Sequence, residues 1–255
     1  MSKLFFKFLL FLFFVLANFN FSFAQNSFLM QQKNASRVTT AFVNNDAKLQ
    51  KEFEAKGLQW PAKYVYIRSF KFDSQLEVWV KNNPKEKYSL FKSYRVCMQS
   101  GTMGPKRLQG DYQVPEGFYY INEFNPHSNY HLSLRLNYPN ASDRILSDSL
   151  RPGNDIYIHG NCVSVGCVAV TDNDIEEIYV LTSYARDAGQ EFIPVHIFPI
   201  KYDNKKSVDY FNNSLKNNPS LEAFSKQLKR AYDEFNETKQ VPLILIDRSG
   251  DYVVN

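Results

Sequence analysis

The sequence predicts a mainly β protein with flanking helices. Aromatic residues make up 16% of the 255-residue chain, with 22 Phe and 16 Tyr, and such side chains favour strands. Between residues 61 and 199, short runs alternate apolar and polar residues with the period of two that half-buried strands have. On either side of this range the apolar spacing changes to three and four residues, which indicates helices. A chain of this length is sufficient for one sizeable domain with extensions.

The first 24 residues have the pattern of a cleaved signal peptide. Lys3 and Lys7 give a positive start, residues 8–17 are apolar, and Ser22 and Ala24 are the small residues that a signal peptidase reads. The apolar run is too short to span a bilayer comfortably. We therefore expect an exported protein, located in the periplasm or cell envelope, with no stable membrane insertion after cleavage.

A helical lead-in is predicted for residues 25–60, where Leu49 and Phe53 have helical spacing and Gly57 marks the end. Short antiparallel strands follow, joined by turns that contain Asp, Ser, Asn or Pro. The predicted strands are residues 63–70, 75–82, 88–101, 118–121, 130–139, 155–160 and 192–200. We expect these strands to form the central domain, residues 61–199.

A helix is predicted directly after the run of short strands. Thr171 is a typical N-cap residue with acids in the turn that follows it, and Gly189 ends the helix. Residues 200–255 are more polar, with an amphipathic helix at 220–237 and a terminal hairpin at 241–254. The sequence therefore predicts a C-terminal helix-and-hairpin extension.

The stretch IHGNCVSVGCVAV, residues 158–170, concentrates the reactive side chains of the chain. It can hold a metal, a disulfide, or a cysteine nucleophile with its base. His159, Cys162 and Cys167 are only three candidate ligands, whereas a structural zinc site takes four, usually in paired units. We expect no metal and no cofactor.

The disulfide interpretation depends on the compartment. Export places the three cysteines of the chain in an oxidising environment, so at least one is unpaired within the monomer. Cys162 can pair with Cys167 or with Cys97, although Cys97, inside a predicted strand, is expected to be a small buried hydrophobe. Cys162 is then either an inert neighbour of Cys167 or its reversible partner. The sequence leaves these alternatives open.

The nucleophile interpretation has the stronger physical support. Gly166 directly precedes Cys167, and a glycine there permits a tight turn and the close approach of a substrate carbonyl. The backbone amides of such a turn can face a developing oxyanion. His159 ends a strand just upstream and is followed by Gly160, so its imidazole is expected to lower the pKa of the thiol.

Two segments resemble the catalytic domain of the L,D-transpeptidase (YkuD-type) family. Residues 157–167, YIHGNCVSVGC, are similar to its signature of a strand ending in His-Gly and then Ser-x-Gly-Cys. Residues 104–121, GPKRLQGDYQVPEGFYYI, resemble its Gly-Asp and Thr-Pro-x-Gly segment, with Val114 in place of Thr. With SNYHLSLRLNYPN at 128–140, the similarity is greatest to the YafK-like branch, and it covers about residues 62–199.

The resemblance implies a β-sandwich-like catalytic domain with helices packed outside. It also implies an exported cysteine transpeptidase that acts on peptidoglycan stem peptides, in which Cys167 forms an acyl-enzyme and His159 is the base. The acceptor is then a stem peptide or a wall-attached protein. A carboxypeptidase- or amidase-type hydrolase that uses the same residues and a non-catalytic wall-binding module are the alternatives that the sequence leaves open.

The match departs from the family at two positions. Val165 replaces a second histidine, and Ala169 stands where arginine or asparagine is common. The first change leaves the base with less support, and neither removes the nucleophile.

Five further residues are expected to support the site or to bind substrate: Gly160, Ser164, Gly166, His131 and Arg135. His131 and Arg135 are four residues apart on a predicted strand, so we expect them on one face, where Arg135 can bind a stem-peptide carboxylate. The net charge of +4 is spread over scattered Lys and Arg residues without a nucleic-acid motif. We therefore expect no nucleic-acid partner.

Overall fold

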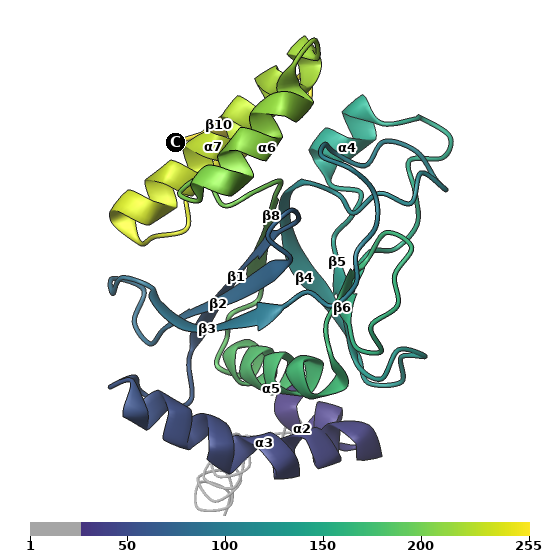
Figure 1. Cartoon of the computed structure of the whole chain (residues 1–255). Coiled ribbons are helices and arrows are strands. Elements are labelled where there is room, and N and C mark those ends of the chain that lie inside the picture. Colours follow the sequence, from purple (N-terminus) through teal and green to yellow (C-terminus); the bar gives the residue numbers. More distant parts are fainter. Residues whose placement is uncertain (1–26) are drawn as a thin grey trace, which may run out of the picture.

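The computed structural model describes residues 27–255, and the predicted signal peptide lies outside the described residues. Its centre is an eight-stranded sheet with the order β3-β2-β1-β8-β4-β5-β6-β7 (Figure 1). The strands are β1 (Tyr64–Phe70), β2 (Gln75–Lys81), β3 (Ser89–Arg95), β4 (Gly117–Asn125), β5 (Ser133–Leu136), β6 (Tyr157–His159), β7 (Val168–Ala169) and β8 (Ile193–Phe198). Helices pack on both faces, so the protein is mainly β with flanking helices, as the sequence predicts.

Two strand pairs are parallel, whereas the antiparallel pairing predicted from the sequence for the strands at 63–70, 75–82 and 88–101 is confirmed by β1, β2 and β3. The parallel pairs are β1 with β8 and β6 with β7. The second is parallel because the loop of residues 160–167 carries the chain back to the start of β6 before β7 begins. The return is short, since β6 has only three residues. The end of this loop, with Cys167, is thereby placed beside the start of β6.

Helix α5 (Asp172–Asp187) covers one face of the sheet (Figure 1). It begins where the sequence predicts, because the side chain of Thr171 accepts a hydrogen bond from the amide of Asp174. Its apolar face lies in the main core together with the strands that carry the candidate site. The fully buried residues of α5 and of β5, β6 and β7 in this core include Ile175, Ile178, Tyr179, Leu134, Ile158 and Val168.

Two helices precede the sheet, α2 (Phe28–Lys33) and α3 (Ser36–Ala55), and both pack behind α5 (Figure 1). The buried face of α3 joins the main core through Val38, Ala41, Phe42, Leu49 and Phe53. Polar contacts reinforce this packing, since Asn45 donates to Glu176 over 3.1 Å and Lys48 forms an ion pair with Glu177. The N-terminal helices support α5 and also contact the sheet, since the ring centroids of Phe53 on α3 and Phe91 on β3 are 4.3 Å apart.

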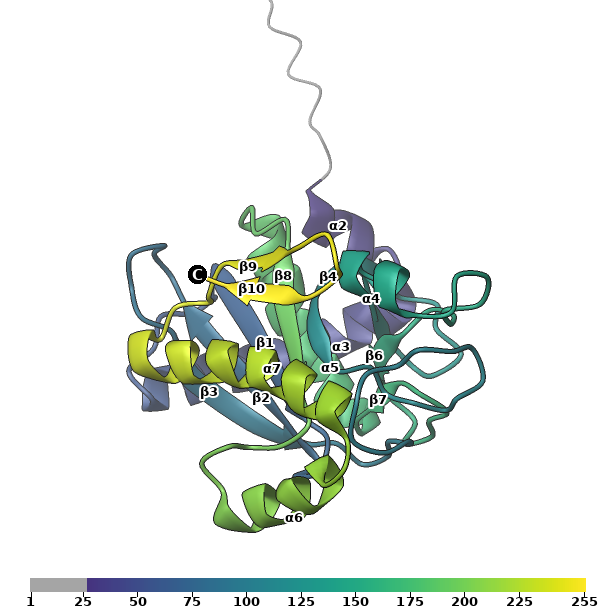
Figure 2. The same ribbon diagram turned by 90° about the horizontal axis from the view of Figure 1, so that it is seen from above.

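The C-terminal segment covers the opposite face of the sheet. Helix α7 (Pro219–Thr238) crosses that face, and β9 (Ile244–Ile246) and β10 (Tyr252–Val254) form the predicted hairpin beside it (Figure 2). A second core joins these elements to the sheet and includes Phe70, Phe118, Phe198, Leu228 and Tyr232. The extension is therefore packed against the sheet along its length.

Two helices were not predicted from the sequence. Helix α6 (Lys205–Leu215) lies in the Asn- and Lys-rich segment, and it buries only Ser207 and Phe211. Helix α4 (Ala141–Leu146) has only six residues and begins with a capping box between Asn140 and Asp143, which is its one sequence signal. Within residues 27–255, no helix combines the length and the apolar character required to cross a bilayer.

The two ends of the sheet meet at one corner. Beyond β3, the amide of Cys97 donates to the carbonyl of Ala169 over 2.9 Å, and the amide of Ala169 donates to the carbonyl of Met98 over 3.2 Å. A disulfide joins Cys97 to Cys162 at the same corner. The expectation that Cys97 is a free buried hydrophobe inside a strand is therefore wrong: β3 ends at Arg95, and Cys97 is half-buried and bonded.

Candidate active site

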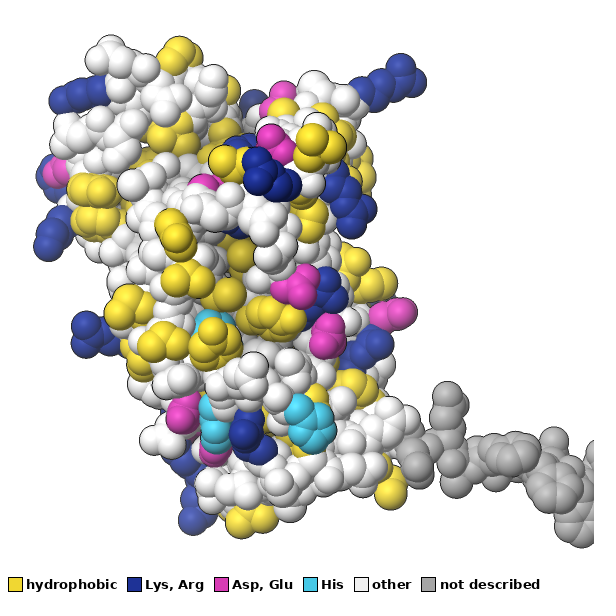
Figure 3. All heavy atoms as spheres, turned by 90° about the vertical axis from the view of Figure 1, so that its right-hand side faces the viewer, with side chains coloured by type: hydrophobic (Ala, Val, Ile, Leu, Met, Phe, Trp, Pro, Cys, Tyr) yellow, Lys and Arg dark blue, Asp and Glu magenta, His cyan; other side chains and the backbone are white. Residues whose placement is uncertain are grey.

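The candidate site lies on the side of the molecule that carries β6 and the loop after it. Hydrophobic side chains gather across the middle of that side, with charged side chains around them (Figure 3). Apolar side chains next to the reactive residues are unusually exposed, with Val163 at 47%, Val165 at 73% and Met98 at 46%. Contiguous exposed apolar surface on a monomeric protein commonly marks a binding region.

The parallel pair β6–β7 places His159 and Cys167 on one face of the sheet. Ile158 is in register with Val168 and His159 with Ala169, so Cys167 lies beside Tyr157. Alternate residues of a strand share a face, and Ile158 and Val168 point into the core under α5. His159 and Cys167 therefore share the opposite face. From standard strand spacing and rise, their Cα atoms are about 8 Å apart.

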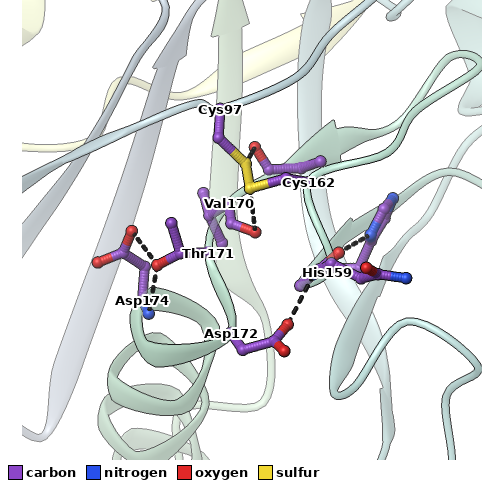
Figure 4. Close-up of a disulfide and its surroundings, with 10 residues drawn as sticks. Cys97, His159, Cys162, Val170, Thr171, Asp172 and Asp174 are labelled. Carbon is purple, nitrogen blue, oxygen red and sulfur yellow. Dashed lines mark hydrogen bonds between the residues drawn. A yellow bond between two sulfur atoms is a disulfide. The ribbon is translucent and has the colours of Figure 1, made fainter.

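The imidazole of His159 is held by its own backbone. Its Nδ1 lies 2.6 Å from the carbonyl oxygen of Gly160 (Figure 4). A carbonyl only accepts hydrogen bonds, so Nδ1 carries the proton and Nε2 presents a lone pair. The ring centroid lies 4.7 Å from that of Tyr130, and the residue is only 2% exposed. Burial lowers the pKa of His159 below its ordinary 6.5, and the bond to Gly160 opposes this.

Cys167 has a free thiol that is half-buried. Burial raises the pKa of the thiol above its ordinary 9.0, the backbone amide of Tyr157 and the charge of Lys106 lower it, and Asp155 raises it. Within residues 27–255, no hydrogen bond joins the thiol to the ring of His159. The expectation that the imidazole lowers the thiol pKa is therefore wrong for this state, in which both groups are neutral at pH 7.

Ser164 organises the turn before the cysteine. Its Oγ accepts hydrogen bonds from the amides of Gly166 (3.2 Å) and Cys167 (2.9 Å) and donates to the carbonyl of Cys167 (2.7 Å). Gly166 has a φ of +131°, and a Cβ there would lie 3.3 Å from the carbonyl oxygen of Gln113. Because Ser164 occupies both amides, they do not form the open oxyanion site that the sequence suggested.

Gly160 lets the first turn of α5 approach the loop. A Cβ at this position would lie 2.5 Å from Oδ1 of Asp172 and 3.1 Å from the side chain of Ile175. The same Asp172 oxygen accepts a hydrogen bond from the amide of Asn161 over 2.7 Å (Figure 4). The helix thus fixes the beginning of the loop immediately after His159.

The disulfide fixes the middle of the loop. Cys162 is joined to Cys97, with Cα atoms 5.5 Å apart, which resolves the alternatives that the sequence left open (Figure 4). Asn161 and Cys162 both have left-handed backbone conformations, with φ of 62° and 29°. Cys162 is therefore neither an inert neighbour nor a partner of Cys167, which is left as the free thiol.

The structure separates the two residues that were expected on one face. His131 precedes β5 with a φ of 68°, and its Nε2 lies 2.8 Å from Glu176 on α5. Arg135, by contrast, is in register with Tyr157 and shares the face of Cys167. The left-handed residue breaks the strand alternation on which the prediction depended. His131 supports the helix and does not reach the site face.

Arg135 lies at the edge of a polar cavity of about 410 Å³. Its guanidinium contacts Asp155 at 2.6 Å and Glu123 at 3.3 Å. Arg144, Asn137 and Asp155 also line this cavity. A row of neighbouring residues crosses β5, β6 and β7: Arg135, Tyr157 and Cys167. The cavity at Arg135 is therefore on the same face of the sheet as the thiol, two strands away.

Sequence reasoning missed the loop that walls the other side of the site. The buried ammonium of Lys71 donates to the carbonyls of Gly104 and Val114 and pairs with Glu116 at 3.0 Å. The side-chain amide of Gln113 donates to the carbonyl of Gly104 over 2.7 Å. Residues 99–116 are thereby ordered beside Gly166. The family-like segment at 104–121 was the signal for this loop, but it did not indicate which side chains hold it.

No group of three or more His, Cys, Asp or Glu side chains within residues 27–255 is arranged to hold a metal ion. The reactive groups of the site are thus one thiol, one imidazole and one guanidinium.

The family is shown by comparison with known proteins. The sequence model of the L,D-transpeptidase catalytic domain (YkuD) matches residues 73–197. "Putative L,D-transpeptidase YafK" of Escherichia coli K12 is 37% identical over 195 residues, which cover 75% of this chain and 74% of the relative. The protein of the same name from Escherichia coli O157:H7 has the same identity and coverage.

Solved structures are more distant. A structure of the helical cell shape determining protein Pgp2 of Campylobacter jejuni has 20% identity and a TM-score of 0.43, with 68% of this chain and 61% of that chain covered. Bd1075 of Bdellovibrio bacteriovorus has 21% identity and a TM-score of 0.39, with 70% and 61% covered. This chain thus spans about three fifths of each of these proteins. The family match and the similarity to the two YafK sequences show that the chain belongs to the L,D-transpeptidase catalytic domain family.

Proposed function

We propose that the protein is an exported, cysteine-dependent L,D-transpeptidase that acts on peptidoglycan stem peptides. The observation that carries the proposal is the parallel β6–β7 pair, which presents a free thiol, Cys167, and an imidazole with an unprotonated Nε2, His159, on one face. The proposed location is the periplasm or cell envelope, without stable membrane insertion after signal cleavage. A non-catalytic module would have no need of this pair.

The reaction begins with the Cys167 thiol and the His159 imidazole both neutral. As the Cys167 sulfur attacks the carbonyl between the L-centre of a diamino acid and the following D-amino acid, His159 Nε2 takes the thiol proton. The imidazolium then gives this proton to the amine of the departing D-amino acid, and a thioester remains. Catalytic hydrogen bonds are often completed only when substrate binds, so the missing Cys167–His159 bond is compatible with these roles.

Arg135 is proposed to bind a carboxylate of the donor stem peptide. It shares the sheet face of Cys167, two strands away, and it faces a polar cavity large enough for part of a peptide. Its present partners, Asp155 and Glu123, are 49% and 48% exposed, so a substrate carboxylate can displace or share them at little desolvation cost. The planar guanidinium can hold a carboxylate through two hydrogen bonds.

Intact mass measurement after incubation with a purified disaccharide tetrapeptide tests the proposal. We expect a thioester adduct on the wild-type protein and none on Cys167→Ala, with both proteins melting at the same temperature. Cross-linked product identifies a transpeptidase, and tripeptide released without cross-linking identifies the hydrolase that uses the same residues. An adduct on Cys167→Ala, or none on the wild type, would contradict the proposed chemistry.

A further inference from the structure

We propose that the polar cavity at Arg135, together with a pocket beside it, binds the sugar that carries the donor stem peptide. The ligand class is an N-acetylated amino sugar, and the protein then recognises its donor through the glycan as well as through the peptide. This inference rests on the proposed function and deepens it. It gives a role to polar and aromatic side chains that the chemistry at Cys167 does not use.

The polar cavity has a volume of about 410 Å³, within the ~300–1,000 Å³ of ordinary ligand sites. Its walls come from β4, the end of β5, the start of α4 and residues 153–155. A second pocket, of about 250 Å³, adjoins it, because Tyr120 and Asn122 line both. Phe192 lines this second pocket. The two hollows thus offer room for more than the carboxylate that Arg135 is proposed to hold.

Polar side chains without partners line the polar cavity. Within residues 27–255, the side chains of Asn122, Arg144 and Asn154 make no hydrogen bond or ion pair, and all three are exposed. Asn137 accepts a hydrogen bond from the amide of Tyr120 over 2.8 Å with its side-chain oxygen, and its side-chain N–H groups remain free. Carboxamides both donate and accept. The cavity therefore matches the hydroxyl and acetamido groups of a sugar, which also do both, better than it matches a purely anionic ligand.

An exposed aromatic ring lies beside these polar groups. Phe192 is 56% exposed, and its ring centroid is 4.8 Å from that of Tyr120, with the two planes at 76°. The edge-to-face contact holds the exposed ring in place. One face of a pyranose ring consists of C–H groups, which can pack on such a ring while the hydroxyl groups around it reach polar side chains. A fixed aromatic surface next to a polar cavity therefore suits a sugar.

The distance of the cavity from the thiol matches the length of the stem peptide. From Cys167 beside β6, Arg135 on β5 is two strands away and Tyr120 on β4 is three, so the cavity lies about 10–14 Å along the sheet from the thiol. The first three residues of a tetrapeptide separate the sugar from the reacting bond, and an extended chain of that length spans about 10 Å. A donor with its reacting carbonyl at Cys167 and a carboxylate at Arg135 therefore brings its sugar into the cavity.

Acylation by two donors tests the inference. One donor is the disaccharide tetrapeptide, and the other is the same tetrapeptide without its sugars. The measured quantity is the second-order rate constant for thioester formation, followed by intact mass. The ratio of the two rate constants reports recognition of the sugar alone, because the reacting bond is the same in both donors.

Two variants probe the site, Phe192→Ala and the double variant Asn122→Ala/Asn154→Ala. All three side chains are exposed, so their removal leaves the core intact, and thermal melts verify this. Tyr210→Ala is the matched control. Tyr210 is a ring of similar exposure, 46%, that packs on Phe72, but it lies on α6 and lines neither pocket.

We expect the wild type to react at least about tenfold faster with the sugar-bearing donor, because the sugar adds several hydrogen bonds and an aromatic contact. Each probe variant should reduce this preference at least about threefold and keep the wild-type rate with the free tetrapeptide. The control should keep the full preference. Equal wild-type rates with both donors, a preference that both probe variants retain, or an equal loss with both donors would overturn the sugar site. A wild type that forms no adduct with either donor would remove the proposed function, and the sugar site with it.

Discussion

Nδ1 of His159 lies 2.6 Å from the carbonyl oxygen of Gly160, the next residue in the chain. The imidazole is therefore oriented by a backbone group rather than by a carboxylate. A carbonyl fixes the tautomer but adds no negative charge to stabilise an imidazolium. Burial then keeps the pKa of His159 low, and the site holds a neutral base beside a neutral thiol.

This charge state predicts a broad, bell-shaped pH profile for acylation. The lower limb belongs to His159, because the imidazolium cannot accept the thiol proton. It lies below the ordinary histidine pKa of 6.5, because burial disfavours the imidazolium and so lowers the pKa of His159. The upper limb belongs to Cys167 and lies above 9.0, because loss of the thiol proton leaves none for the departing amine. Measurement of kcat/KM from about pH 4 to 10 checks both limbs. An upper limb below 9.0 would indicate a thiolate–imidazolium pair instead, because the proton lost there would be that of the imidazolium.

Replacement of the base is expected to slow acylation strongly. His159→Gln removes the Nε2 lone pair, and general-base catalysis is typically worth about 10²- to 10⁴-fold. His159 is only 2% exposed and packs on Tyr130, so some loss of stability is expected as well. A thermal melt of the variant measures its loss of stability. Tyr130→Leu is the control, because it loses the same packing and keeps the base. Near-normal acylation by a folded His159→Gln would exclude His159 as the base.

The disulfide is expected to contribute to stability. It joins residues 65 positions apart, and closing a loop of that length stabilises a fold by about 2–4 kcal/mol. We therefore expect reductant to lower the free energy of unfolding of the wild type by this amount. Urea denaturation with and without reductant measures it, and the Cys97→Ser/Cys162→Ser double variant should be insensitive to reductant. A wild type equally stable in both conditions would show that the bridge is not formed in solution.

Substitution of Arg135 is expected to weaken donor binding. Arg135→Gln loses a charge-assisted bond worth about 1.5–3 kcal/mol, which corresponds to a roughly 10- to 100-fold rise in the donor KM with little change in kcat. Arg230→Gln makes the same change of charge on the exposed face of α7 and should leave KM unaltered. A fall in kcat at constant KM would place Arg135 in the chemical step, and no change would remove it from the site.

The fold was largely predictable because alternation and capping are local signals. The strands at 63–70 and 75–82 appear almost at their predicted limits as β1 and β2, and Thr171 begins α5 as expected. The parallel pairs were not predictable in this way. Whether β6 and β7 run parallel depends on the path of the intervening loop, which hydrophobic periodicity does not encode.

The candidate site was only partly predictable, because contacts between distant segments have no local sequence signal. Cys167 and His159 are recognisable from a compact stretch of sequence, but the partner of Cys162 lies 65 residues away. Cys97 appeared to lie inside a strand because the apolar alternation continues past Arg95, where the ladder with β2 ends. His131 was misplaced because a non-glycine residue with a φ of 68° has no reliable sequence signal.

The contact of Cys97 and Met98 with Ala169 leaves β7 without an open hydrogen-bonding edge. A last strand of a sheet ordinarily offers unpaired amides and carbonyls, and many proteins use such an edge to take up an extended peptide as an additional strand. Here those groups of Ala169 are already paired with the chain that follows β3. An extended substrate therefore cannot reach Cys167 by joining the sheet. It must be recognised through its side chains and termini, which favours selection by chemical groups over selection by backbone shape.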